Sequence, residues 1–243
     1  MNIVLAKFAL ISLSLFLVGY GLAALLFVRT RRQLRGSDLQ KKIHTWVPIF
    51  MVVVVLAWCP RWVAAGVLLA VAVAVVDEYV QRQRSVVKTV WAPMHGALVV
   101  TGLAALYLLT DGNGTTLLAV WYLSVVSDVT AYFFGNFFGR HNLPEAFNRH
   151  KSWEGVMGQL VGAGIGYVLF MTVATLPVWV WPAVGIGAAM GDMANSYVKR
   201  AERFKDWSNT IPGHGGFIDR LSSLSYAAII VSLLARLLTL TVG

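Results

Sequence analysis

The stretch from Ser196 to Ser222 reads SYVKRAERFKDWSNTIPGHGGFIDRLS, a polar, glycine-punctuated segment between two apolar runs. Lipid tolerates such backbone and charge only where they reach water or line a protected site. The stretch is therefore expected to form a loop at one face of a membrane. Its basic residues surround a Pro-Gly-His-Gly-Gly turn, a combination that suits phosphate groups; they are Lys199, Arg200, Arg203 and Lys205.

The composition of the whole chain agrees with a membrane protein. Of its 243 residues, 58% are hydrophobic and 13% are charged, whereas a soluble domain carries about 25% charged residues. The formal net charge of +9 lies in short loops between apolar runs. No basic stripe with interleaved aromatic residues appears outside those runs, so nucleic acid is not an expected partner.

The apolar runs predict an all-α polytopic integral membrane protein with about eight transmembrane helices. The expected spans are 3–28, 45–60, 62–80, 90–110, 114–134, 155–175, 178–196 and 221–240. Pro48 and the triplet Cys59-Pro60-Arg61 interrupt the second and third runs, so a re-entrant hairpin is an alternative there. No repeat or linker stands out, and residues 1–243 are expected to form a single domain.

The distribution of basic residues predicts the orientation in the membrane. With both termini outside, the four inside loops are about 29–44, 77–89, 135–154 and 197–220. All 20 Lys and Arg residues except Lys7, Arg61 and Arg236 then fall in or beside these loops, as the positive-inside rule requires. The first run lacks a clear cleavage site, so it is expected to span rather than to be removed. Short loops favour a prokaryotic inner membrane.

Glycines in the sixth run indicate close helix packing. Gly158, Gly162 and Gly166 recur at four-residue spacing, which lets two membrane helices approach each other. A nucleotide-binding glycine loop would need a preceding strand, and none is expected here.

Two aspartates near the inner ends of apolar runs, Asp128 and Asp192, are candidate site residues. A carboxylate there is costly unless it is paired or metal-bound, and a simple ion pair with a nearby Lys or Arg is the alternative reading. Asp192 and Asp219 flank the same loop, so their helix ends can meet. Carboxylates beside several cations favour Mg²⁺ with bound phosphate over zinc, which prefers His or Cys ligands. His214 either contacts a phosphate or holds the loop in shape.

These residues occur in a pattern that resembles the phosphatidate cytidylyltransferases, also called CDP-diacylglycerol synthases. The family signature S-x-x-K-R-x(4)-K-D-x(5)-[PG]-x-H-G-G-x-x-D-R-x-D matches in register from Ser196 to Arg220. The upstream segments SDVTAYFFG (127–135), KSWEG (151–155) and GD (191–192) also resemble the family. The specific match covers residues 127–222, within a C-terminal part of catalytic-type helices (91–243), whereas residues 1–90 agree only in being hydrophobic spans with basic inner loops. At the last position the family has aspartate, and this chain has Ser222, a neutral and weaker ligand.

The resemblance implies transfer of a cytidylyl group from CTP to phosphatidic acid or a similar lipid phosphate, at the cytoplasmic face. Expected metal ligands are Asp192, Asp219 and, by position, Ser222, for Mg²⁺ and for a second cation as an open alternative. Asp192, Asp219, Lys199 and Lys205 are the expected catalytic residues. Expected substrate-binding residues are Asp128, Lys151, Glu154, Ser196, Arg200, His214, Gly215, Gly216 and Arg220. Membrane lipids are the expected surroundings, and a homodimer is left open.

Other functions remain as alternatives. A catalytically impaired relative would bind nucleotide or lipid phosphate without turnover. A CTP-dependent polyprenol kinase, or a cytidylyltransferase with another lipid acceptor, would use the same nucleotide for a different product. A transporter is disfavoured, because its charges should lie near the membrane midplane between repeated halves.

Overall fold

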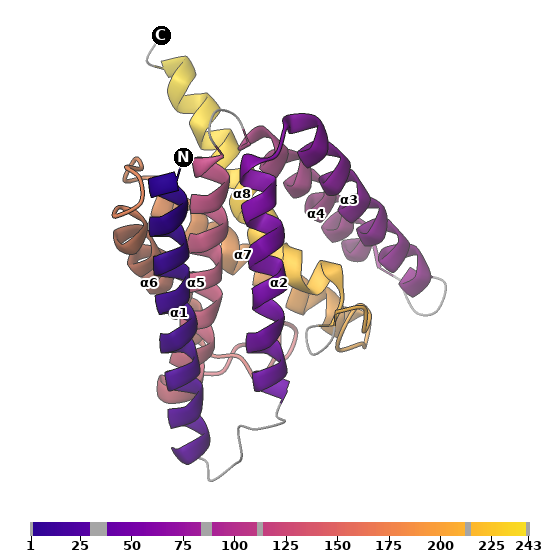
Figure 1. Ribbon diagram of the computed structural model, residues 1–243. Helices are drawn as coiled ribbons and strands as arrows, with labels where there is room; N and C mark the ends of the chain where they lie inside the picture. The colour runs from indigo at the N-terminus through magenta and orange to yellow at the C-terminus, as the bar shows by residue number, and fades with distance from the viewer. Residues whose placement is uncertain (1, 30–37, 84–88, 111–113, 212–214, 242–243) are drawn as a thin grey trace.

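The computed structural model describes residues 2–29, 38–83, 89–110, 114–211 and 215–241, and these residues form eight α-helices and two isolated β-bridges (Figure 1). The helices are α1 (Asn2–Arg29), α2 (Asp38–Trp58), α3 (Arg61–Gln83), α4 (Trp91–Leu108), α5 (Thr115–Phe138), α6 (Trp153–Phe170), α7 (Val180–Ala201) and α8 (Phe217–Thr241). One helix corresponds to each predicted span, so the predicted all-α class is confirmed.

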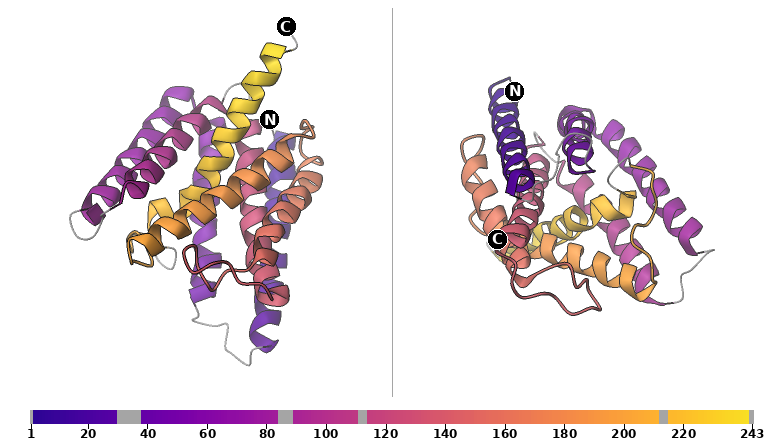
Figure 2. Two further views of the ribbon diagram at one scale, coloured as in Figure 1. Left: turned by 180° about the vertical axis from the view of Figure 1, so that it is seen from behind. Right: turned by 90° about the horizontal axis from the view of Figure 1, so that it is seen from below.

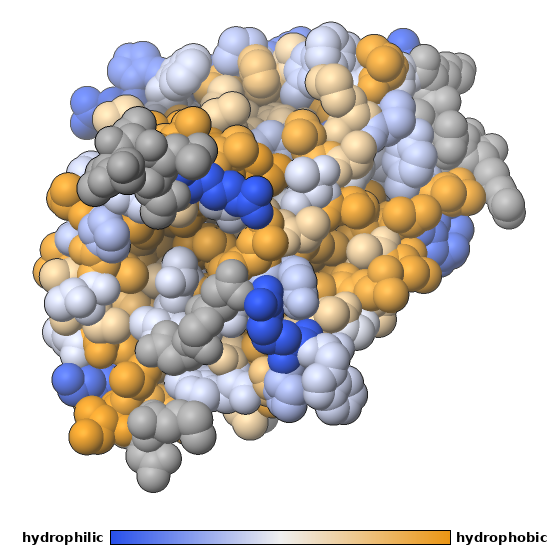
Figure 3. Space-filling model, turned by 90° about the horizontal axis from the view of Figure 1, so that it is seen from above, coloured by the Kyte–Doolittle hydropathy of each residue, from blue (hydrophilic) through white to orange (hydrophobic). Residues whose placement is uncertain are grey.

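Five of the described helices, α1, α3, α4, α5 and α8, are long and apolar enough to cross a membrane, and α2 carries a shorter apolar segment, Val47–Trp58. Seen from the end where α1 begins and α8 finishes, hydrophobic side chains form most of the surface, and hydrophilic ones appear in small separate groups (Figure 3). These features are those of a polytopic membrane protein. The number of spans and their orientation stay predictions.

Several helix ends differ from the expected span ends. α2 begins at Asp38 and α8 at Phe217, several residues before the apolar runs at 45 and 221, because hydropathy marks the lipid-facing part of a helix and not its hydrogen-bonded ends. α6 finishes at Phe170 rather than near 175. The chain turns there through backbone bonds from Val173 and Ala174 to the carbonyl of Phe170.

Helices α5 and α6 form the most extensive helix pair. A Cβ atom on Gly158 would lie 2.8 Å from Phe134 Cβ, and one on Gly162 would lie 2.7 Å from Thr130 Cβ. Any larger side chain would therefore push the two helices apart. The predicted role of these glycines in close helix packing is confirmed.

The remaining helices build two groups around that pair. α7 packs along α8, and α8 packs against α4, which in turn forms a hairpin with α3 (Figure 2, left). Viewed from below, α1 and α2 lie on the side of the molecule opposite α7 (Figure 2, right). In Figure 1 the α5–α6 connection and the described residues that follow α7 lie lower in the view than the start of α1.

Candidate functional site

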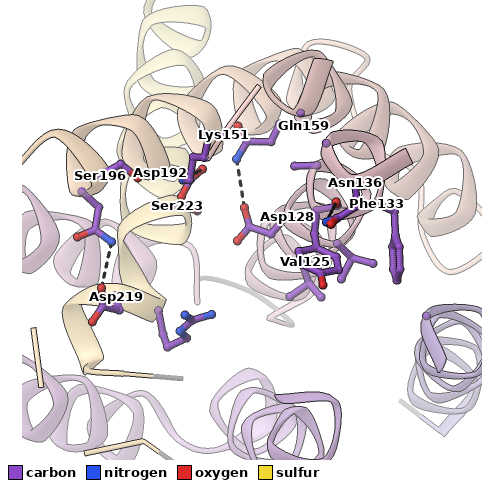
Figure 4. Close-up of a pocket in the computed structure, with 18 of the residues that line it drawn as sticks. Val125, Asp128, Phe133, Asn136, Lys151, Gln159, Asp192, Ser196, Asp219 and Ser223 are labelled. Carbon is purple, nitrogen blue, oxygen red and sulfur yellow. Dashed lines mark hydrogen bonds and ion pairs between the residues drawn. The ribbon is translucent and has the colours of Figure 1, made fainter. Parts of the chain in front are cut away.

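A cavity of about 890 Å³ lies between α1, α2, α5, α6, α7 and α8. Its polar end combines carboxylates and basic side chains from α5, α7, α8 and the loops before α6 and α8 (Figure 4). Apolar side chains from α1, α2 and α5, such as Phe16, Phe50 and Val125, form the wall beyond. The lining includes nine residues predicted from the sequence: Asp128, Lys151, Asp192, Ser196, Lys199, Arg200, Lys205, Asp219 and Arg220.

Helix periodicity explains how α7 supplies so many of these groups. Asp192, Asn195, Ser196, Lys199 and Arg200 stand at positions i, i+3, i+4, i+7 and i+8, which share one face of an α-helix. All five line the cavity. This polar face at the end of an otherwise apolar helix faces the cavity and not lipid.

Lys151 reaches the cavity from the loop that precedes α6. The Lys151 backbone is held on both sides, because Leu143 N donates to its carbonyl and its own N–H donates to Asn148. Ser152 then caps α6 by accepting a hydrogen bond from Gly155 N at 3.2 Å, a favoured arrangement at helix starts. The Lys151 ammonium thereby meets the Asp192 carboxylate, with Nζ 2.5 Å from Oδ2.

Two carboxylates face this part of the cavity, Asp192 from α7 and Asp128 from α5. They lie close enough to interact electrostatically. Asp128 accepts a hydrogen bond from Gln159 Nε2 at 3.3 Å (Figure 4) and a second one from Ser223. The side chain of Asp192 remains 35% exposed, with Lys151 at one of its two oxygens. Two ionised carboxylates that interact in this way repel each other, and a cation bound between them would relieve the repulsion.

Asp219 is the most completely bonded carboxylate in the cavity wall. Its Oδ1 accepts from Lys199 Nζ at 2.5 Å and from Asn195 Nδ2 at 3.5 Å. Its Oδ2 accepts from the backbone N–H groups of Trp207 at 2.8 Å and Gly216 at 3.0 Å. The side chain is 1% exposed. A carboxylate accepts about four hydrogen bonds, so Asp219 as it stands holds the loop and Lys199 in place.

The charges lining the cavity nearly cancel. Five basic side chains line it, from Lys151, Lys199, Arg200, Lys205 and Arg220. Four carboxylates oppose them, from Asp128, Asp192, Asp206 and Asp219. The negative charge of a triphosphate is larger than the net positive charge of this lining. Protein sites of this kind often bind Mg²⁺ between their carboxylates and the phosphates of the ligand.

Ser222 lies outside the cavity lining, in a buried contact between α8 and α4. Its Oγ donates to the carbonyl of Ile218 at 2.5 Å, so the 3.1 Å contact with His95 Nε2 must use an imidazole N–H as donor. His95 Nδ1 then accepts from the hydroxyl of Tyr226, 3.0 Å away. The structure thus surrounds Ser222 with hydrogen-bonding partners, and the side chain is 1% exposed. The backbone of Ser222 packs against Gly191, the neighbour of Asp192 on α7, and the role of Ser222 as a cation ligand stays a prediction.

Three other predicted residues, Glu154, Gly215 and Gly216, are not part of the cavity lining, and a fourth, His214, is not among the described residues. Glu154 pairs with His141, with Oε1 2.6 Å from Nδ1, and this hydrogen bond lowers the pKa of Glu154 to about 2. The N–H of Gly216 is directed to Asp219, and the carbonyl of Gly215 accepts from Ile211 N.

Sequence reasoning missed several polar groups at or near the site, and three of them hold other site residues. Gln159 and Ser223 hold Asp128, and His95 supports Ser222. His95 stands within the apolar run of α4. An ionisable residue in such a run is a candidate functional residue, so His95 could have been identified from the sequence. Gln159 and Ser223 are neutral residues, and no local pattern separates them from ordinary helix-packing side chains.

Comparison with known proteins adds an independent line of evidence. The profile of the cytidylyltransferase family matches residues 1–238. A phosphatidate cytidylyltransferase of Mycobacterium leprae (strain TN) is 32% identical over 153 residues, which cover 61% of this chain and 47% of that protein. A phosphatidate cytidylyltransferase of Brucella abortus biovar 1 (strain 9-941) is 34% identical over 124 residues, 49% of this chain and 46% of that protein.

These matches are partial on the side of the relatives, because the chain spans about half the length of the relatives it matches. The family profile, in contrast, covers nearly the whole chain, including the N-terminal helices whose sequence carries no specific motif. The chain belongs to the cytidylyltransferase family.

Proposed function

We propose that this protein transfers the cytidylyl group of CTP to phosphatidic acid, giving CDP-diacylglycerol and pyrophosphate. The observation that carries the proposal is the two-part cavity, with basic groups and carboxylates at one end and an apolar wall along α1, α2 and α5. A lipid phosphate has this same division between a charged head and apolar chains. Two relatives named phosphatidate cytidylyltransferase support the choice of reaction.

The reaction needs little covalent chemistry from the protein. A phosphate oxygen of the lipid attacks the α-phosphorus of CTP, the bond from that phosphorus to the bridging oxygen breaks, and pyrophosphate leaves. The lipid phosphate is largely ionised near neutral pH, with a second pKa near 6, so no general base is required. Catalysis then rests on positioning and on neutralising the developing charge.

The basic residues of the cavity divide into two groups. Arg200, Lys205 and Arg220 are proposed to bind the triphosphate and the lipid phosphate, Arg through two parallel hydrogen bonds. Lys151 and Lys199 already pair with carboxylates and are proposed to keep Asp192 and Asp219 oriented. Ser196 lines the same wall and offers a hydroxyl to a phosphate oxygen.

The donor set fits Mg²⁺ at Asp192 with Asp128 facing it, because both present carboxylate oxygens to the cavity. Bound there, Mg²⁺ would neutralise phosphate charge and stabilise the leaving pyrophosphate. Among the described residues no three His, Cys, Asp or Glu side chains form a complete metal cluster, and substrate phosphates commonly supply the remaining ligands of Mg²⁺. Asp219 fits this role less well, since its oxygens are already engaged by four donors. A second cation stays open.

A product analysis tests the proposal. The purified protein in detergent is incubated with Mg²⁺, phosphatidic acid and CTP labelled at the α-phosphate, and the lipid fraction should gain the label. CTP labelled at the γ-phosphate should leave its label in pyrophosphate. Transfer of the γ-label to lipid would instead identify a kinase, and tight binding of CTP without either product would identify an impaired family member.

The proposed setting is a prokaryotic inner membrane with the polar end of the cavity facing the cytoplasm, where CTP is found. Cysteine-accessibility labelling of the α5–α6 and α7–α8 loops in intact cells would test this orientation. No nucleic acid is proposed as a partner. A homodimer stays a prediction, which mass measurement in native lipid particles would test.

A further inference from the structure

Glu78 on α3 is a buried carboxylate that the cavity does not use. It is 5% exposed and lies near the end of the apolar run of α3. A buried carboxylate is costly unless several donors satisfy it. Its partners come from a region of the chain about 140 residues away.

Those partners are the first backbone groups of α8. Glu78 Oε1 accepts from Phe217 N at 3.2 Å, and Oε2 accepts from Ile218 N at 2.9 Å. Ser208 Oγ also donates to Oε1. The first N–H groups of a helix have no partner within the helix, and an anion there is favoured by the helix dipole.

The residue that would normally cap α8 has no side chain. α8 begins at Phe217, so the N-cap position belongs to Gly216. A Cβ atom built on Gly216 would overlap the Glu78 carboxylate. Glu78 therefore occupies the place of the absent side chain and performs the capping that Ser, Thr, Asp or Asn usually provides within the same helix.

One turn further along α3, Arg82 contacts the other end of the same loop. Its Nη2 donates to the carbonyl of Asp206 at 2.5 Å, and its guanidinium lies over the ring of Phe204, 4.6 Å from the centroid. Glu78 and Arg82 are four residues apart and share one face of α3. This face contacts residues 204–208, which follow α7 and bring Lys205 to the cavity, and the first turn of α8, which carries Asp219 and Arg220.

We propose that Glu78 is a positioning residue, which caps α8 from α3 and thereby sets the loop and the first turn of α8 that line the cavity. The side chain does not line the cavity and has no direct contact with substrate in this role. The consequence for binding rests on the proposed function, since the groups it positions are those assigned to the phosphates. The capping itself is independent of any reaction.

Limited proteolysis of the intact protein tests the capping without an activity assay. Arg203 and Lys205 are exposed trypsin sites in the loop. Glu78→Gln keeps the side-chain volume but turns an amide NH₂ toward backbone donors. We expect cleavage at these sites to accelerate at least about tenfold, the scale of losing one charged cap. Asp77→Asn is the matched control, because Asp77 is the exposed neighbour on the same helix and should digest like the wild type.

A sharper test moves the capping group from Glu78 on α3 to residue 216, the N-cap position of α8 itself. Gly216→Ser alone should disturb the loop, because its Cβ meets the Glu78 carboxylate. Glu78→Ala alone should disturb it through the lost cap. The double variant Glu78→Ala/Gly216→Ser should digest more slowly than either single variant, because serine now caps its own helix in the space that Glu78 vacated. Additive damage in the double variant would overturn the proposal.

Enzyme kinetics of the Glu78 variants distinguish the positioning role of Glu78 from the proposed cytidylyl transfer. In a preparation that makes CDP-lipid, Glu78→Gln should raise the KM for CTP about tenfold with a smaller change in kcat, and Glu78→Asp should recover part of the loss. Proteolysis that changes as expected in a protein without transfer activity would refute the proposed function only. Unchanged proteolysis of Glu78→Gln in an active protein would refute the positioning role only.

Discussion

The region from Ser127 to Ser223 and the N-terminal helices α1–α3 contribute different things to the same site. The first supplies all the Lys, Arg and Asp residues of the cavity lining and contains the segments that resemble a family signature, with Ser222 as the departure. The second carries no such motif, yet α1 and α2 provide apolar wall, and α3 holds the loop before α8 through Glu78 and Arg82. Reactive groups are recognisable in sequence because their chemistry restricts residue type. Supporting contacts are not, because many residues can provide them.

The largest effect is expected for Asp192, in the motif-bearing region. Asp192→Asn removes one carboxylate charge from the proposed cation site while keeping the shape of the side chain, which is 35% exposed. We expect kcat to fall by about 10²- to 10³-fold, the scale of deleting one electrostatic contact to a transition state. Cytidylyl transfer measured over a range of Mg²⁺ concentrations checks this. The Asp77→Asn variant should keep wild-type activity, and comparable rates in both variants would remove Asp192 from the site.

The next prediction concerns the apolar wall supplied by α1. Gly19 lines the cavity, and a Cβ placed on it would meet nothing within 4 Å, so Gly19→Leu should fill space without displacing the helix. We expect kcat/KM for long-chain phosphatidic acid to fall about tenfold, within the range for changes in apolar pocket contacts. A short-chain analogue should be less affected. Gly21→Leu is the control, because Gly21 is equally open and is not part of the cavity wall. Equal losses for both acyl lengths would argue against an acyl-chain wall at α1.

A smaller effect, on stability, is expected at the boundary between the two regions. Ser222→Ala leaves the Nε2–H of buried His95 without its acceptor, which typically costs about 1–3 kcal/mol. Thermal unfolding in detergent should show this loss, and Tyr226→Phe should show a similar one. The Mg²⁺ dependence of the reaction should not change, since Ser222 lies outside the cavity. Unaltered stability combined with a higher Mg²⁺ requirement would restore Ser222 as a cation ligand.

The smallest effect is expected at the exposed pair of Glu154 and His141, outside the cavity. The pKa of Glu154 is lowered from 4.5 to about 2 by its hydrogen bond with His141. A carboxylate with a depressed folded-state pKa adds stability above its unfolded pKa and loses that contribution as the pH falls through the folded value. The small stability difference between wild type and Glu154→Gln should therefore be constant near neutral pH and shrink between about pH 4.5 and pH 2. Thermal unfolding over this range tests it, and a difference that grows on acidification would contradict the assignment.

Much of the fold follows from local sequence properties. Apolar runs locate each helix because burial in lipid requires about 20 apolar residues, and the glycines of α6 indicate a close neighbour because only glycine leaves room for it. The helix ends were less predictable. α8, for example, begins at Phe217, four residues before the apolar run that predicted its start, and its first N–H groups donate to Glu78 from α3.

The candidate site was predictable to the extent that residue types and spacing restrict it. Asp192, Ser196 and Lys199 were identified from a signature, and helix periodicity alone places them on one face. Ser222 shows where this reasoning is incomplete. It stands three residues after Asp219, a spacing that places two residues on neighbouring parts of one helix face. Its hydroxyl nevertheless contacts the Ile218 carbonyl and His95, and His95 lies 127 positions away in the sequence, where no local pattern indicates the contact.

The sequence by itself determined the class of fold, the helices that are long and apolar enough to cross a membrane, and most of the charged residues that line the cavity. These are local properties, set by hydropathy and by the spacing of polar residues. Only the tertiary structure decided which carboxylates remain open to a ligand, which are saturated, and which helix caps α8. Those outcomes depend on contacts such as Glu78 with Phe217, between residues 139 positions apart. No local pattern encodes such a pairing, because it arises only when α3 and α8 are packed together.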